Sequence, residues 1–178
     1  FAFMEKFTGK KYPYSKYAQI VVTDFMWGGM ENTTATTLSE RIIHDARAVG
    51  DWSNDGLILH ELAHQWFGDL ITCKDWSNLW LNEGFATYLE SLYFEETRGV
   101  DAFDYDRVTA AGWYMGGSYW RPVSEQRYAH PDDLFDGHAY GKAAAILHML
   151  RYTVGAEVFQ AGVQLYIQRH ADALVEGH

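Results

Sequence analysis

The segment His60-Glu61-Leu62-Ala63-His64 has the residue types and the spacing of a catalytic metal site. Residues four apart lie on the same face of a helix, so the two imidazoles can reach one cation. The glutamate between them can then act on a water molecule held by that cation. Taken alone the motif is only moderately specific, because the same three residues also occur by chance on a helix whose charged face is simply solvated.

The residues around the motif favour the metal site over a solvated helix face. Most of them are apolar: Leu57, Ile58, Leu59, Leu62, Ala63, Trp66 and Phe67. A helix that is apolar on nearly every side is expected to be buried. Two histidines and a glutamate inside it then need partners, because unpaired buried polar groups are costly. A metal ion supplies such a partner.

A third ligand is expected from Glu83, which follows His64 at a distance that lets one helix end and a second begin. Asn82 is predicted to cap this second helix, which places Glu83 in the first turn, where the helix dipole favours an anion. Two imidazoles and one carboxylate, with a fourth position open, form the catalytic rather than the structural zinc arrangement. We therefore expect one Zn²⁺ ion bound by His60, His64 and Glu83.

The composition bounds the partners and the location of the protein. A net charge of −10 argues against nucleic acid or an anionic membrane as the main partner. The sequence has no apolar run that could span a bilayer, and Phe1–Lys11 lacks the layout of a signal peptide. The single cysteine, Cys73, excludes an intrachain disulfide. We expect a soluble piece of a longer polypeptide; a cytoplasmic location stays open, as does the oligomeric state.

Around the motif, strands are predicted early in the chain and helices late. β-branched residues indicate a strand over Tyr17–Phe25 and a further strand or edge over Asn32–Leu38. Arg41–Trp52 is predicted to be a loop and Gly68–Trp76 a short connection. Further helices are expected from Asn82 to a stop at Gly99, from Asp101, over Lys142–Arg151 and over Val158–Arg169. Gly112–Trp120 is predicted to be an aromatic loop.

This order of elements predicts an α+β fold. The 178 residues suffice for a single domain with a sizeable core. Within it we expect an N-terminal lobe with a mixed β-sheet, at about residues 1–70, and a mainly helical lobe at about residues 71–178. The active-site cleft is expected between the two lobes.

Four motifs occur in an order that resembles a known family. They are Gly28-Gly29-Met30-Glu31-Asn32, His60–His64 with Gln65-Trp66-Phe67-Gly68, Leu81-Asn82-Glu83-Gly84-Phe85-Ala86, and Tyr140-Gly141-Lys142-Ala143. Together they resemble the aminopeptidase-N family of gluzincin zinc metallopeptidases, which also includes the leukotriene epoxide hydrolase. The resemblance implies that residues 1–178 form a thermolysin-like catalytic domain. It also implies that the N-terminal β-rich and C-terminal helical domains of the family are absent from this chain.

The resemblance further implies a role for each motif residue. The zinc ligands would be His60, His64 and Glu83, and Glu61 would be the general base. Tyr140 would donate a hydrogen bond to the oxyanion that forms from the scissile carbonyl.

For the substrate, the resemblance implies that Glu31 binds the free α-ammonium group of a peptide. Gly28, Gly29 and Met30 would line the extended substrate and the first side-chain pocket. The predicted function is therefore that of a zinc aminopeptidase acting on peptides. Two alternatives stay open: an endopeptidase with an open cleft, and a catalytically inactive peptide-binding module.

Two residues depart from the pattern that the family usually shows. Gly141 stands where Glu or Ser is usual, and it is expected to loosen the backbone that aims the Tyr140 phenol. Asp69 stands where Asn is common, and the sequence does not indicate its effect.

Overall fold

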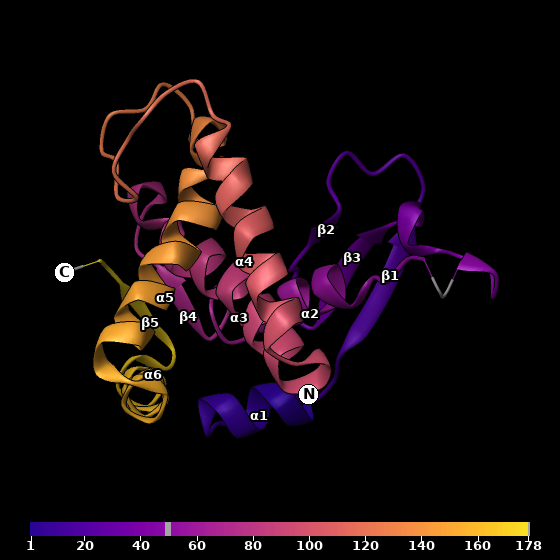
Figure 1. The fold of residues 1–178 in the computed structure, drawn as a ribbon, viewed down its shortest axis with the longest axis horizontal. Helices are drawn as coiled ribbons and strands as arrows, with labels where there is room; N and C mark the ends of the chain where they lie inside the picture. The colour runs from indigo at the N-terminus through magenta and orange to yellow at the C-terminus, as the bar shows by residue number, and fades with distance from the viewer. Residues whose placement is uncertain (49–50, 178) are drawn as a thin grey trace.

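The computed structural model of the protein describes residues 1–48 and 51–177. The N-terminal part forms a small β-sheet beside a group of helices that come mostly from later in the chain (Figure 1). This confirms the predicted α+β fold. The lobe boundary near residue 70 and the assignment to a single domain stay predictions. Among the helices of the described residues, none combines the length and the apolar character that crossing a bilayer requires.

The larger sheet is mixed, as predicted. Its strands are β1 (Ala18–Val22), β2 (Gly29–Met30) and β3 (Ala35–Ser39), in the order β1-β3-β2. β1 runs parallel to β3, whereas β2 is antiparallel to it and pairs Gly29 with Leu38. Leu38 is fully buried, which fixes the face that β3 turns toward the interior. The sheet therefore holds Gly29 and Met30 at its edge within the described residues.

The predicted loop Arg41–Trp52 is only partly observed. Its first two residues belong to a 3-10 turn over Glu40–Ile42, and Asn54 Nδ2 donates to Ile42 O at 2.6 Å. Residues 49–50 of the predicted loop lie outside the described residues. Helix α2 (Asp55–Ala63) follows, and Ser53 Oγ accepts a hydrogen bond from Asp55 N at 3.2 Å.

Helix α3 (Trp80–Arg98) begins before the residue that the sequence indicated. The prediction that Asn82 caps this helix is wrong, because Asn82 lies inside the first turn and its Oδ1 accepts from Cys73 N at 3.2 Å. Glu83 nevertheless stays in the first turn, and the predicted stop at Gly99, with φ of 93°, is confirmed. The Asn82 side chain thus joins the helix to the strand before it instead of satisfying the helix end.

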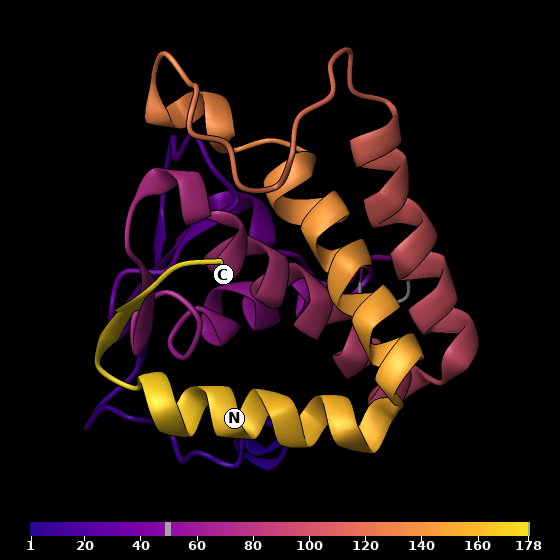
Figure 2. The same ribbon diagram turned by 90° about the vertical axis from the view of Figure 1, so that its left-hand side faces the viewer.

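Four further α-helices belong to the described part of the fold (Figure 2). They are α1 (Ala2–Thr8), α4 (Val100–Met115), α5 (Ala143–Val154) and α6 (Ala156–His170). Gly155, with φ of 90°, separates α5 from α6. The predicted aromatic loop begins later than expected, because Gly112–Met115 continue α4.

One pair of strands was not predicted. β4 (Ile71–Cys73) and β5 (Ala173–Val175) pair in parallel, with Ile71 opposite Ala173. β4 lies in the segment predicted to be a simple connection. A three-residue strand leaves almost no periodic signal, and its partner lies near the other end of the chain. The later part of the molecule is therefore not purely helical.

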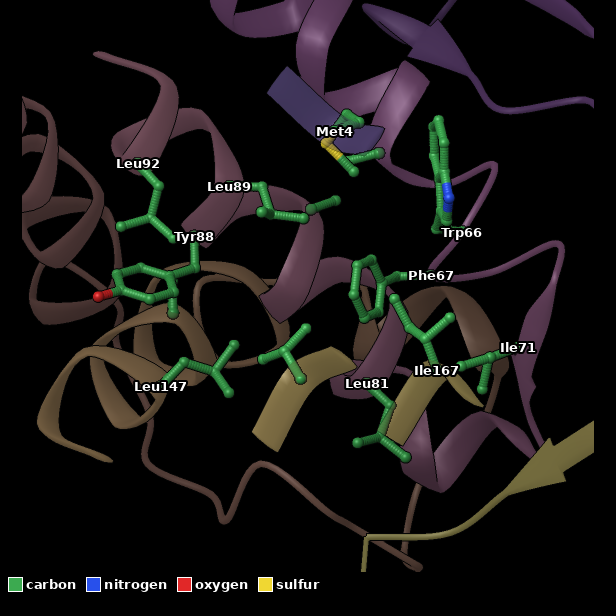
Figure 3. Packing of buried hydrophobic residues seen from close by; sticks show 14 of the residues in the cluster. Met4, Trp66, Phe67, Ile71, Leu81, Tyr88, Leu89, Leu92, Leu147 and Ile167 are labelled. Carbon is green, nitrogen blue, oxygen red and sulfur yellow. The ribbon is translucent and has the colours of Figure 1, made fainter. Parts of the chain in front are cut away.

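The main hydrophobic core lies between α2, α3, α5 and α6 (Figure 3). Trp66, Phe67 and Tyr88 are among its largest fully buried side chains. The rings of Phe67 and Phe85 stack at 4.5 Å between centroids. The buried side chains of this core hold α2 and α3 in one arrangement, because close-packed interiors tolerate little displacement.

Candidate metal centre

The side chains of His60, His64 and Glu83 converge at the contact between α2 and α3. His64 Nε2 lies 3.1 Å from His60 Nε2, and Glu83 Oε2 lies 3.2 Å from each of these nitrogens. His64 directly follows α2, but its backbone is still helical, with φ of −58° and ψ of −25°. The His64 and Glu83 side chains are almost completely buried, and that of His60 is 12% exposed.

The separations among these three atoms fit one zinc ion. Tetrahedral ligands at zinc–nitrogen and zinc–oxygen distances of about 2.0–2.1 Å lie about 3.3 Å from one another. The three observed separations, 3.1, 3.2 and 3.2 Å, match one face of such a tetrahedron.

The hydrogen bonds on the far side of each imidazole support the same conclusion. His64 Nδ1 lies 3.0 Å from Phe67 O, and His60 Nδ1 lies 2.7 Å from Glu90 Oε1. A carbonyl or carboxylate oxygen only accepts, so both Nδ1 atoms donate. In the neutral rings each Nε2 then carries a lone pair, and both point at the Glu83 carboxylate. Three converging lone pairs without a hydrogen between them repel one another, so the arrangement favours positive charge among them, as a metal ion or as a proton on one ring.

The charges around the cluster also favour a cation. Burial alone would lower the pKa of His60, but hydrogen bonds to Glu83 and Glu90 outweigh it and raise that pKa well above the ordinary value. Burial likewise opposes the charge of His64, yet Glu83 raises its pKa to about 9. The Glu83 pKa is lowered because the two imidazoles outweigh the effect of burial. The protein therefore favours positive charge at this position.

Glu90 is a functional candidate that the sequence analysis missed. It lies two turns after Glu83 on α3, so both carboxylates face the same neighbour. That two-turn spacing is the signal in the sequence that could have identified Glu90. Its bond to His60 Nδ1 fixes the orientation and the tautomer of the ring, which is the usual task of a carboxylate behind a metal-binding histidine.

Replacing Glu90 by Leu is expected to weaken zinc binding by about 10- to 100-fold, since the acceptor that orients His60 is lost. Competition with a chromophoric chelator measures the affinity. Glu96→Leu is the matched control, because Glu96 lies exposed on the same helix and pairs with Lys6. Equal affinities of Glu90→Leu and the wild type would remove Glu90 from the metal centre.

Glu61 points into the same region from α2. Burial raises the pKa of this carboxyl to about 7, and its Oε2 has no hydrogen-bond partner among the described residues. A side chain at position 29 would collide with it, because a Cβ placed on Gly29 would lie 2.5 Å from Glu61 Cδ. The strand β2 therefore passes directly over the carboxylate. A pKa near neutrality suits a group that accepts and returns a proton.

Tyr140 covers the other side of the cluster. Its ring stacks on that of His60, with centroids 5.9 Å apart and planes 11° apart, and contacts Trp113 at 5.2 Å. The phenol interacts with Glu83. Burial and this carboxylate raise the pKa of Tyr140, so the phenol keeps its proton and can act as a donor.

The backbone that carries Tyr140 is a π-helical turn over His138–Lys142, which leads directly into α5. Such turns are rare and frequently lie at functional sites. Gly141 is buried, and any Cβ on it would collide with the carbonyl oxygen of Ala110 in α4. The expectation that Gly141 loosens this backbone is therefore wrong, because the glycine lets the turn pack tightly against α4.

A polar network holds the segment that precedes this turn. Arg121 donates through Nε and Nη2 to the two oxygens of Asp136, at 3.0 and 2.7 Å. The Asp136 carboxylate also accepts from His138 N, and Lys142 Nζ donates to Arg121 O at 2.5 Å. These bonds connect both ends of the π-helical turn to the loop after α4.

The predicted substrate-binding residues lie beside the metal centre. Glu31 Oε1 is 4.0 Å from His64 Nδ1, and the Glu31 side chain is 21% exposed. Met30 is 36% exposed, whereas Gly28 packs against Leu57, 3.3 Å from the position of a Cβ on the glycine. The Glu31 carboxylate thus reaches solvent next to a buried ligand.

Asp69, the second departure from the family pattern, is close to this group. Burial raises its pKa to about 6, with Thr33 lowering it and Glu31 raising it. Its Oδ2 has no hydrogen-bond partner within the part of the chain that the structure describes. The aspartate therefore adds to the acidic character around Glu31.

Comparison with known proteins identifies a common domain. Residues 1–177 match the domain described as Peptidase family M1. Aminopeptidase N of Streptomyces lividans is 39% identical over 181 residues, which cover 95% of this chain and 21% of that protein. Endoplasmic reticulum aminopeptidase 1 of Homo sapiens is 34% identical over 187 residues, covering 95% and 19%. The chain spans about a fifth of the length of these curated relatives.

Solved structures share the fold. Yeast LTA4 hydrolase in complex with bestatin matches with a TM-score of 0.90 and 25% identity, over 99% of this chain and 29% of that one. A mutant M1 zinc metallopeptidase from Deinococcus radiodurans, bound to a Tyr-Ser-Ala substrate, matches with a TM-score of 0.78 and 30% identity. That match covers 98% of this chain and 36% of the other.

Proposed function

Because this chain belongs to the peptidase M1 family, we propose that it is the catalytic part of a zinc aminopeptidase that removes N-terminal residues from peptides. The observation that carries the proposal is the convergence of His60, His64 and Glu83 at zinc-ligand spacing. The names of the relatives support it, since two of them are aminopeptidases. A Tyr-Ser-Ala substrate bound to a structural neighbour supports peptides as substrates.

Glu61 would serve as the general base and then as the general acid. Zinc held by the three ligands would lower the pKa of a bound water and polarise the scissile carbonyl. Glu61 would accept the proton of the attacking water and deliver it to the departing amine. Its buried carboxyl, with a pKa of about 7, suits both transfers.

Tyr140 would stabilise the negative charge that develops on the carbonyl oxygen. Its phenol keeps its proton, and its ring lies against that of His60 beside the metal-ligand cluster. A hydrogen bond to the oxyanion is stronger in the transition state than in the bound substrate, and such a bond accelerates the reaction.

Glu31 and β2 would position the substrate. β2 is one of the two edge strands of its sheet within the described residues, so the Gly28–Met30 segment can pair with an extended peptide. Glu31 follows this strand and offers a carboxylate to the α-ammonium group of the peptide. That ion pair would place the first peptide bond at the metal centre and give the preference for chain ends.

Hydrolysis of leucine p-nitroanilide and its N-acetylated form tests this proposal. Wild type is expected to prefer the free amine, and Glu31→Gln to lose about 10- to 100-fold of that preference, as expected for a charged hydrogen bond. Glu40→Gln is the matched control, because Glu40 is exposed in the same lobe.

Each alternative predicts a different result in these assays. Equal rates on the two wild-type substrates would overturn the exopeptidase proposal. Cleavage of an N-blocked, internally quenched peptide would support an endopeptidase. The absence of zinc-dependent turnover on every substrate would leave a peptide-binding module.

A further inference from the structure

Gln65 directly follows the zinc-ligand candidate His64 and is completely buried. Its amide group contacts three partners from earlier in the chain. Nε2 donates to Glu31 O at 3.0 Å, while Oε1 accepts from Thr34 N at 2.9 Å and from the Tyr12 hydroxyl at 3.3 Å. A buried amide is costly unless its donors and acceptors are bonded, and here both ends of the amide are.

The segment that Gln65 holds has an unusual backbone. Thr34 has φ of 66°, in the left-handed region that a β-branched residue rarely adopts. Asn32 O accepts from Ala35 N at 2.8 Å, which closes a tight turn around Thr34. A conformation of this kind persists only where its surroundings enforce it, and the bond from Thr34 N to Gln65 is one such contact.

This strained turn lies immediately after Glu31. The preceding strand is fixed as well, because Gly29 packs against the Glu61 carboxylate. Glu31 is therefore held from one side by β2 and from the other by the turn whose backbone Gln65 binds. Because Gln65 adjoins His64, the same stretch of backbone places both the metal-ligand candidate His64 and the Gln65 amide that binds the Glu31 segment.

We propose that Gln65 is a positioning residue that sets the distance between the Glu31 carboxylate and the metal centre, and thereby the preference for substrates with a free amine. The inference rests on the proposed function, in which Glu31 binds the α-ammonium group. Gln65 touches neither the substrate nor the metal. It acts through the Glu31 backbone and through the turn at Thr34, and losing it shifts the ammonium site relative to the scissile bond.

The test uses Gln65→Met in the zinc-loaded chain, since Met has a similar length but makes none of the three hydrogen bonds. The probes are leucine hydroxamate and its N-acetylated form, whose dissociation constants are measured by calorimetry and do not depend on turnover. The preference for the free amine is expected to fall by about 10- to 100-fold, because small displacements of a positioning group have effects of this size. Zinc affinity is expected to stay unchanged.

Two variants separate positioning from general packing. Tyr12→Phe removes another bond to the same Gln65 but leaves its bond to Glu31, and is expected to keep the preference. Gln164→Met removes a glutamine that donates to Phe7 O at 3.0 Å, far from the metal ligands along the chain. This variant is also expected to keep the preference for the free amine. If Gln65→Met does not fold, Gln65→Glu replaces it, because the carboxylate keeps the acceptor and removes the donor toward Glu31 O.

An unchanged preference in the Gln65 variant, or an equal loss in Gln164→Met, overturns the inference and leaves the proposed function intact. If the wild type itself shows no preference for the free amine, the amine-recognition part of the proposed function fails together with the inference. Hydrolysis of the N-acetylated anilide by the wild type identifies that second case.

Discussion

Glu61→Gln is expected to lower kcat for leucine p-nitroanilide by about 100- to 10,000-fold, the range that general acid–base catalysis contributes. The amide keeps the shape of the side chain beside Gly29 but cannot accept and return a proton at neutral pH. Steady-state kinetics measure the loss. Zinc content, determined by atomic absorption, is expected to match the wild type because the three ligand candidates are unchanged.

The matched control for this variant is Glu157→Gln, which alters an exposed carboxylate at the start of α6. It is expected to leave kcat unchanged. If wild type and Glu61→Gln show the same trace turnover, Glu61 has no catalytic role and the peptide-binding module becomes the better interpretation.

Tyr140→Phe is expected to lower kcat by about 100- to 1,000-fold, as the loss of one oxyanion donor does. KM is expected to stay near the wild-type value, because the hydrogen bond matters mainly in the transition state. The stacking of the ring on His60 is preserved, so zinc affinity is expected to stay the same.

Tyr105→Phe serves as the control, since Tyr105 lies on α4 with 76% of its surface exposed. A Tyr140→Phe variant with unchanged kcat and raised KM would contradict the assignment. Such a result would place the phenol in ground-state binding of the substrate.

The parts of the fold that were predicted from sequence are those with local signals. β-branched residues mark β1, and apolar periodicity with a terminal glycine marks α3. The start of α3 was missed because Asn82 is a good cap by type, yet its side chain is used by Cys73 N. The pairing of β4 with β5 was missed because it depends on contacts between distant segments.

The same distinction between local signals and distant contacts applies to the residues of the candidate site. The two histidines and Glu61 follow from one helical segment, and Glu83 from the next helix. Gln65 was identified in the sequence only as part of a motif, because its role depends on partners such as Glu31 O and Thr34 N, far away in sequence. The π-helical turn under Tyr140 also carries no local signal, since it results from packing against α4.

The contact between Gly29 and Glu61 has a consequence for how the chain can change over generations. Gly29 is not among the glycines with a left-handed backbone, so its conformation would admit alanine. An alanine would meet the end of the Glu61 side chain, which occupies the space a methyl group would need, so the carboxylate would have to shift. The two positions are therefore coupled: a larger residue at position 29 displaces the carboxylate of Glu61, and the chain accepts it only where the displaced carboxylate still reaches the metal centre.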